Sequence, residues 1–170
     1  MSAIYHGSIS SIYDNPLKNR NETGGLVNVT VMHEMEYLRL EPEQALPEWP
    51  YFRPYQAVVV IEEKVSYEWQ QQVSEWLVET GCLYMMAWGE SCSSWDDSVD
   101  LANMKKFNFE KVPEKEFVLT TWHEDEPIDE AFLYSKSNAI HPEIGVLKPV
   151  IIHISKTDKR NVFISKYASV

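Results

Sequence analysis

The chain has few of the residues from which disulfide, zinc and nucleotide sites are usually built. Cys82 and Cys92 are the only cysteines among its 170 residues, which is too few for a disulfide framework or a cysteine-ligated zinc cluster. Six glycines are present, and none of them belongs to a GxGxxG or GxxxxGK[ST] motif. The sequence therefore argues against a dinucleotide or a nucleoside triphosphate as the ligand.

Long apolar runs and positive charge are also scarce. A typical apolar run, AVVVI at residues 57–61, is far too short to span a membrane, and the first residues lack the basic and apolar regions of a signal peptide. Lys and Arg number 15 against 26 Asp and Glu, so the net charge is -11. A field of this sign repels nucleic-acid backbones and anionic membranes and attracts basic partners. We therefore expect a cytoplasmic protein that binds neither nucleic acid nor a membrane.

Apolar and aromatic residues, by contrast, are plentiful. Hydrophobic residues make up 44% of the chain, which is enough for one globular domain with a core. Six Trp and nine Tyr help to bring the aromatic share to 12%, and so many rings do not all fit into one small core. We therefore expect some of them on the surface, where aromatic side chains are typical of protein interfaces.

Two kinds of apolar pattern alternate after residue 54. Continuous apolar runs are typical of strands buried on both faces, and apolar residues at helical spacing are typical of helices that cover a sheet. Their alternation predicts an α/β fold, a Rossmann-like three-layer sandwich with a mainly parallel sheet of four to five strands and helices on both faces. The strands are expected at 55–63, 82–89, 116–123 and 148–155, with a short fifth at 160–167, and the helices at 66–81, 93–107 and 126–140.

Several helix ends are marked by residues that favour them. Ser66 is the expected N-cap of the first helix, and Gly81 is expected just beyond its end. Ser94 followed by Asp97 has the spacing of a capping box for the second helix. Pro127 is expected at the first turn of the third helix.

Residues 1–54 have a different character. Residues 1–25 are mixed and polar, as in a loosely ordered arm, and 26–42 alternate as in one strand or a hairpin. Four prolines between Pro42 and Pro54 predict an extended connector. We therefore divide the chain into an N-terminal arm with its connector, 1–54, and an α/β core, 55–170, which together form one globular unit.

The segments that follow the four main strands carry most of the polar side chains. Ligands of open parallel sheets bind beyond the carboxyl ends of the strands, so these segments are expected to line a binding edge. Carboxylates at helix starts also stabilise the helix dipole, and capping is the alternative explanation for them. The residues predicted to bind a partner at this edge are Trp88, Glu90, Trp95, Asp96, Asp97, Trp122, Glu124, Asp125 and Glu126.

A catalytic interpretation of the same edge is also open. Cys92 near a helix start, His123 at a strand end and Asp97 are able to form a nucleophile–base–carboxylate set, which would make the protein a hydrolase or transferase. The alternative is a polar cysteine and a histidine bonded to a carboxylate, and no GxSxG motif supports acyl transfer. His153, inside the last main strand, is expected to be a hydrogen-bonded core histidine.

A metal is the remaining alternative for this edge. Grouped carboxylates with His123 suit Mg²⁺ or Mn²⁺, but their spacing matches no ligand motif, and we expect no cofactor.

Two strings resemble an uncharacterised family of small bacterial domains. They are AWGESCSSWDDSVD at 87–100 and FVLTTWHEDEP at 117–127, and the resemblance covers about residues 55–155. It implies a bacterial origin and one structural unit that contains both strings. No activity follows from it.

The sequence leaves two hypotheses for function. The first is a small acidic binding protein, without catalytic activity, that engages a basic protein partner as an immunity protein engages a toxin. Its basis is the net charge, the aromatic surplus and the lack of a complete catalytic motif. The second is the enzyme built on Cys92 and His123, or on a carboxylate-bound metal. The binding protein is the favoured hypothesis.

Overall fold

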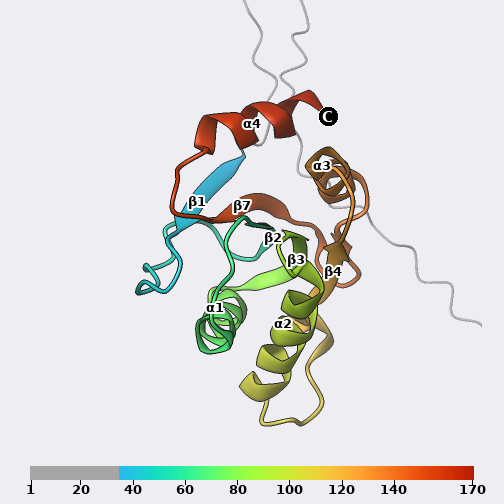
Figure 1. Ribbon diagram of the computed structural model, residues 1–170. Helices are drawn as coiled ribbons and strands as arrows, with labels where there is room; N and C mark the ends of the chain where they lie inside the picture. The colour runs from blue at the N-terminus through green and yellow to red at the C-terminus, as the bar shows by residue number, and fades with distance from the viewer. Residues whose placement is uncertain (1–34) are drawn as a thin grey trace, which may run out of the picture. The chain divides into compact units, whose positions relative to one another are not determined.

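The strands of the main sheet all run in the same direction, in the order β1-β7-β2-β3-β4 (Figure 1). The computed structural model describes residues 35–170. The strands are β1 (Glu36–Leu40), β2 (Tyr55–Ile61), β3 (Cys82–Gly89), β4 (Leu119–His123) and β7 (Lys148–Ile154), and the helices are α1 (Tyr67–Glu79), α2 (Cys92–Lys106), α3 (Ile128–Ser137) and α4 (Arg160–Ser169). A two-stranded antiparallel hairpin, β5 (Ile140–His141) and β6 (Gly145–Val146), precedes β7, and a short 3₁₀ helix (Glu114–Glu116) precedes β4.

Helices cover both faces of this sheet. Figure 1 shows α1 and α2 on one face and α3 and α4 on the other. The side chains of β2 alternate between the two layers, because successive residues of a strand point to opposite faces. Val59 packs in the core under α1 and α2, and Val58 packs in the core under α3 and α4. The predicted Rossmann-like sandwich is therefore confirmed.

The central strands are apolar because both of their faces are covered. All seven residues of β2 are buried, and Ala57 to Val60 have no exposed surface. Burying each Val or Ile side chain contributes about 1.5–3 kcal/mol. The continuous apolar run at residues 55–61 is therefore the main signal from which this fold is predicted.

The start of α1 agrees with the sequence, and the start of α2 does not. Ser66 caps α1 by accepting a hydrogen bond from the Trp69 backbone, and Gly81 follows the helix with a φ of +91°. The second helix begins at Cys92 after Ser91, whose φ is 52°, so Ser94 lies inside the helix and the predicted capping box is absent. The hydroxyl of Ser94 instead donates to the Ser91 carbonyl.

The predicted fifth strand at 160–167 is wrong, because these residues form α4. Two of its aromatic residues, Phe163 and Tyr167, are four positions apart and both buried. The Phe163 ring lies 4.9 Å from the His153 ring, and the Tyr167 ring lies 5.3 Å from that of Phe132. Packing of this helical face over the sheet outweighs the strand-like local pattern.

The fifth strand of the sheet is β1, which pairs with β7. After it, the proline-rich connector crosses the α1 face, where Trp49 stacks on Tyr55 with ring centroids 4.0 Å apart. The compact unit runs from His33 to Val170, so β1 and the connector belong to it together with the residues after 55. The predicted arm at 1–25, and most of the strand or hairpin at 26–42, lie outside the described residues.

Candidate functional site

The polar segments after the strands do meet at one edge of the sheet. The last residue of β2, Ile61, pairs with Gly89 of β3 and with Ile154 of β7, and Trp88 pairs with His123 of β4. We call the junctions that follow these strands the carboxyl rim: residues 62–66, 90–94, 124–127 and 155–159. Its existence follows from the parallel topology, as predicted.

Gly89 brings β2 and β3 together at this rim. Its φ is +105°, and a Cβ at this position would overlap the carbonyl oxygen of Ile61. The next residue, Glu90, donates its backbone N–H to the same carbonyl at 2.9 Å. A residue without a side chain is therefore required where the chain turns from β3 into α2.

The strand order changes direction between β2 and β7. The chain leaves β2 for α1 on one face and leaves the neighbouring β7 for α4 on the other, and ligands of open parallel sheets bind at such a point. A shallow depression of about 530 Å³ lies at this point. Its lining residues are Ile61, Glu62, Glu63, Trp88, Gly89, Glu90, Ser155, Thr157 and Lys159.

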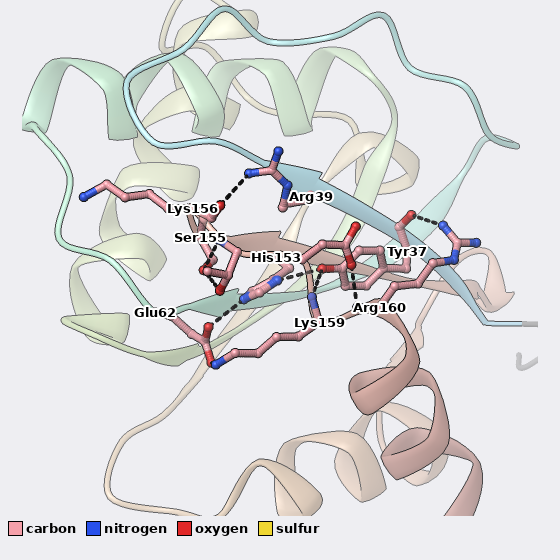
Figure 2. A network of polar contacts seen from close by, with 10 residues as sticks. Tyr37, Arg39, Glu62, His153, Ser155, Lys156, Lys159 and Arg160 are labelled. Carbon is pink, nitrogen blue, oxygen red and sulfur yellow. Dashed lines mark hydrogen bonds and ion pairs between the residues drawn. The ribbon is translucent and has the colours of Figure 1, made fainter.

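A chain of polar contacts underlies this depression (Figure 2). His153, with no exposed surface, lies between the Tyr37 hydroxyl at 2.7 Å from its Nδ1 and a Glu62 carboxylate oxygen at 3.0 Å from its Nε2. The other Glu62 oxygen accepts a hydrogen bond from Lys159 Nζ at 2.7 Å. Figure 2 shows these side chains converging from β1, β2, β7 and the start of α4.

The positions of the hydrogens in this network of polar contacts follow from which of its groups can only accept a hydrogen bond. The backbone N–H of Lys159 donates to the Tyr37 oxygen at 3.2 Å, which leaves the Tyr37 hydrogen free to donate to Nδ1 of His153. An ionised Glu62 is an acceptor only, so Nε2 of His153 carries the hydrogen that faces it. Every polar atom of the neutral His153 ring is thereby bonded.

The pKa shifts in this network agree with that assignment. Burial lowers the pKa of His153 and outweighs the opposite effect of Glu62, which favours the neutral ring. Burial alone would raise the pKa of Glu62, but hydrogen bonds from Lys159 and His153 outweigh it and the pKa is lowered. Burial also raises the pKa of Tyr37. These groups hold four elements together, and the expectation of a hydrogen-bonded core histidine at 153 is confirmed.

The structure does not bring Cys92 and His123 together as a nucleophile and its base. Cys92 is fully buried in the core under α1 and α2, whereas the His123 ring packs against Tyr134 of α3 on the opposite face. Burial, together with the nearby Glu124, raises the pKa of the Cys92 thiol, which disfavours the reactive thiolate. Asp97 is exposed on α2.

His123 is bonded on one side only. Its Nδ1 lies 3.0 Å from a Glu126 carboxylate oxygen, and its Nε2 is buried without a hydrogen-bond partner. The side chain is 8% exposed, while that of Glu126 is 51% exposed. The sequence alternative of a strand-end histidine bonded to a carboxylate describes this arrangement.

The three tryptophans predicted at the edge have different surroundings. Trp95 is 1% exposed and belongs to the core, so its predicted role as a surface residue is wrong: the helix turns it toward the sheet. Trp88 is partly buried and donates its indole N–H to the Glu126 carbonyl at 2.7 Å. Trp122, at 51%, is the exposed one of the three.

The predicted acidic residues lie at or near the rim. Glu90, Glu124 and Asp125 are exposed, and within residues 35–170 they form no ion pair. Asp96 and Asp97 lie on α2 near Asp100, whose pKa is raised by burial and by these two neighbours despite a hydrogen bond from Thr120. The rim of β3 and β4 is therefore negatively charged.

No metal centre is built from these residues. Within residues 35–170, no three His, Cys, Asp or Glu side chains are grouped so that they could hold a metal ion. The carboxylates are spread along the rim, and His123 directs one nitrogen to Glu126.

Sequence reasoning missed the central members of the network. Glu62 and Lys159 lie in segments that were recognised as part of the binding edge, but neither was singled out. Tyr37 gave no signal at all, because its partner His153 is 116 positions away.

Comparison with known proteins places the described unit in a family without assigning an activity. A search of curated proteins and a search of solved structures each found no match. In residues 35–170 no helix is both long and apolar enough to cross a membrane. One family model, described as a domain of unknown function (DUF7684), matches residues 35–170, a longer stretch than the resemblance at 55–155. The chain belongs to the DUF7684 family.

Proposed function

We propose that this protein is a non-catalytic binding module that engages a basic protein partner through the carboxyl rim of its sheet. The observation that carries the proposal is the gathering of exposed carboxylates from successive strand–helix junctions at one edge. Glu90 comes from the junction after β3, and Glu124 and Asp125 from the junction after β4. Because they form no ion pairs within residues 35–170, their charge is available to a partner.

Two features favour binding over catalysis. The thiol that sequence reasoning considered as a nucleophile, Cys92, is buried and its pKa is raised. The histidine at the centre of the polar network, His153, has both ring nitrogens bonded and no exposed surface. Cys92 lacks the access and the thiolate state of a nucleophile, and His153 lacks the access and the free nitrogen of a general base.

Long-range electrostatics supports the choice of partner. A net charge of -11 accelerates encounter with basic proteins, and unpaired rim carboxylates give the encounter an orientation. Half-exposed Trp122 stands beside them as an anchor of the type that dominates interface energies. The specific form of the proposal is an inhibitor that covers a basic surface of an enzyme, as an immunity protein covers a toxin.

Charge reversal tests the proposal. A labelled oligoarginine peptide serves as the probe, and its affinity is measured by fluorescence anisotropy at about 0.15 M ionic strength. We expect the double variant Glu90→Lys/Glu124→Lys to weaken binding about tenfold, because two favourable charge contacts become repulsive.

The matched control carries the same charge change at the opposite end of α2. Glu110 and Glu114 are exposed, and the variant Glu110→Lys/Glu114→Lys should change the affinity by about twofold or less. Equal weakening by both variants would mean that the peptide senses net charge alone. That outcome, or equal binding of an oligoglutamate peptide, contradicts the proposal.

A further inference from the structure

β4 is an edge strand, and within residues 35–170 no strand pairs with its outer side. Its inner side pairs with β3 from Leu119 to His123. An open edge of this kind presents backbone N–H and C=O groups to which another extended chain can bind.

Exposed apolar side chains surround this edge. The hairpin β5–β6 lies beside the start of β4, because His141 Nε2 and the Phe117 carbonyl oxygen are 3.0 Å apart. Of the ten large apolar side chains that are exposed in residues 35–170, six lie between positions 117 and 146: Phe117, Trp122, Leu133, Ile140, Ile144 and Val146. Such a concentration marks an interaction surface.

Carboxylates flank the edge on both faces of the sheet. On the α2 face, Asp100 accepts a hydrogen bond from Thr120 at 3.1 Å, with Asp96 and Asp97 close to it. On the α3 face, Glu126 and Glu130 stand beside β4. An added strand projects its side chains alternately to the two faces of the sheet. Its basic side chains would therefore meet carboxylates on whichever face they point to.

A recess on the α3 face supplies an independent sign of a ligand. It has a volume of about 390 Å³ and lies between β4 and α3. Two of its lining residues, Thr121 and His123, have a buried side-chain atom without a hydrogen-bond partner: Oγ1 and Nε2. Few buried polar atoms in native proteins lack a partner, and in the neutral ring, whose Nδ1 donates to Glu126, Nε2 is an acceptor.

An arginine side chain has the chemistry that this recess requires. Its guanidinium supplies N–H donors for Nε2 of His123 and for the carboxylate of Glu130. The two unpartnered atoms are covered, so the side chain reaches them by displacing a wall residue. Leu133 of α3, which is 47% exposed, is a wall residue able to yield.

We propose that the outer edge of β4 takes up an extended, arginine-containing segment of the basic partner as an additional strand, with one arginine entering the recess beside His123. The inference rests on the proposed function and specifies how the partner is held. Charge complementarity selects this occupant over a second copy of the chain, since a second β4 edge would bring the same carboxylates against these.

Peptide probes with altered backbones test strand addition on the full chain. The probe is a labelled peptide of alternating Arg and Val, compared with two versions that are N-methylated at alternate residues in opposite frames. N-methylation removes backbone donors and keeps the side chains. We expect one frame to weaken binding about tenfold or more and the other to retain it, because an added strand donates to β4 from one side only. Hydrogen exchange of the β4 amides that point away from β3 should slow when the unmodified peptide binds.

A pair of variants tests the recess. Glu130→Gln should weaken the Arg–Val peptide about threefold to tenfold, and an otherwise identical peptide with citrulline in place of arginine should lose this dependence. Glu110→Gln, which makes the same change at the far end of α2, should leave the affinity unchanged.

The outcomes separate this inference from the proposed function. If both N-methylated peptides bind equally well and only the Glu90→Lys/Glu124→Lys variant loses affinity, strand addition is overturned. The proposed function of the acidic rim then still holds. A frame-dependent loss that is insensitive to those reversals supports strand addition and contradicts the rim. Protection, without peptide, of the β4 amides that point away from β3, or a dimer in sedimentation that the peptide does not dissociate, means that the chain itself fills the edge and overturns the inference.

Discussion

Two histidines on neighbouring parts of the carboxyl edge have opposite surroundings. His153, at the centre of the sheet, is bonded through both nitrogens to Tyr37 and Glu62. His123, on the edge strand β4, is bonded to the half-exposed Glu126 and has a second nitrogen without a partner. The comparison separates two roles for polar residues at strand ends: at the centre they join elements, and at the edge they leave bonding capacity for a ligand.

The same contrast extends to the surrounding surface. Around β2 and β7, Lys159 and Lys156 pair with Glu62 and Glu63, so the charges of that region are largely balanced. Just after β4, the exposed Glu124 and Asp125 form no ion pair within residues 35–170, and the exposed Trp122 precedes them on the strand. Unpaired carboxylates and an exposed aromatic side chain, the groups suited to bind a partner, are thus concentrated on the β4 side of the rim.

Of the predicted effects on folding, the largest is the difference in unfolding free energy lost by the two histidine-to-alanine variants. His153→Ala leaves Tyr37 and Glu62 without their partner and creates a cavity, so the free energy of unfolding should fall by about 3–5 kcal/mol. His123→Ala should cost about 1–2 kcal/mol, because Glu126 remains half exposed to water. Chemical denaturation of both variants measures the difference. Equal losses would contradict the distinction between a closed centre and an open edge.

The acid dependence of stability should be traceable to the central network. His153 has a lowered pKa when folded, so between about pH 7 and about pH 5 the unfolded chain binds more protons at this residue and stability falls with falling pH. The lowered pKa of Glu62 adds a further loss below about pH 4.3, as its carboxylate becomes protonated.

Unfolding free energies measured across this pH range would isolate the His153 contribution. The variant His153→Gln should have a flatter profile between about pH 7 and about pH 5. An unchanged profile in this variant would show that another group causes the acid sensitivity.

Truncation of the exposed indole should have the smallest effect on folding. Trp122→Ala should change the unfolding free energy by about 0.5 kcal/mol or less, since half of the side chain is already in water. The control is Trp95→Ala, where loss of a buried ring should cost about 3–5 kcal/mol. A large loss for Trp122 in thermal or chemical denaturation would identify it as a structural residue and weaken its case as an anchor.

The fold was predictable where burial is reflected in a local pattern of apolar residues in the sequence. The β-branched run at 57–61 is buried on both faces and reads as a central strand, and Ser66 and Gly81 mark the two ends of α1. The segment 160–167 was misjudged because its local apolar pattern also suits a strand. The packing of Phe163 on His153 and of Tyr167 on Phe132, from one face of a helix, favours the helical form.

The site was predictable in position and less so in detail. Parallel strands force their carboxyl ends to one edge, which is why the acidic junctions at 90 and 124–126 were found. Trp95 was ambiguous, because a tryptophan on a helix face is compatible with either core or surface until the direction of the sheet is known. Tyr37 and His153 are 116 positions apart, and no residue spacing within a single sequence predicts contact between such a pair.

The place of β7 in the sheet has a consequence for how the protein is made. This strand, late in the chain, is inserted between β1 and β2, which have no direct pairing with each other. Until the ribosome has released residues 148–154, β1 therefore has no partner among the strands of residues 35–170. Assembly of the β1 side of the sheet has to wait for β7. A product truncated before β7 would expose an unpaired β1 and one open side of β2 to chaperones and proteases.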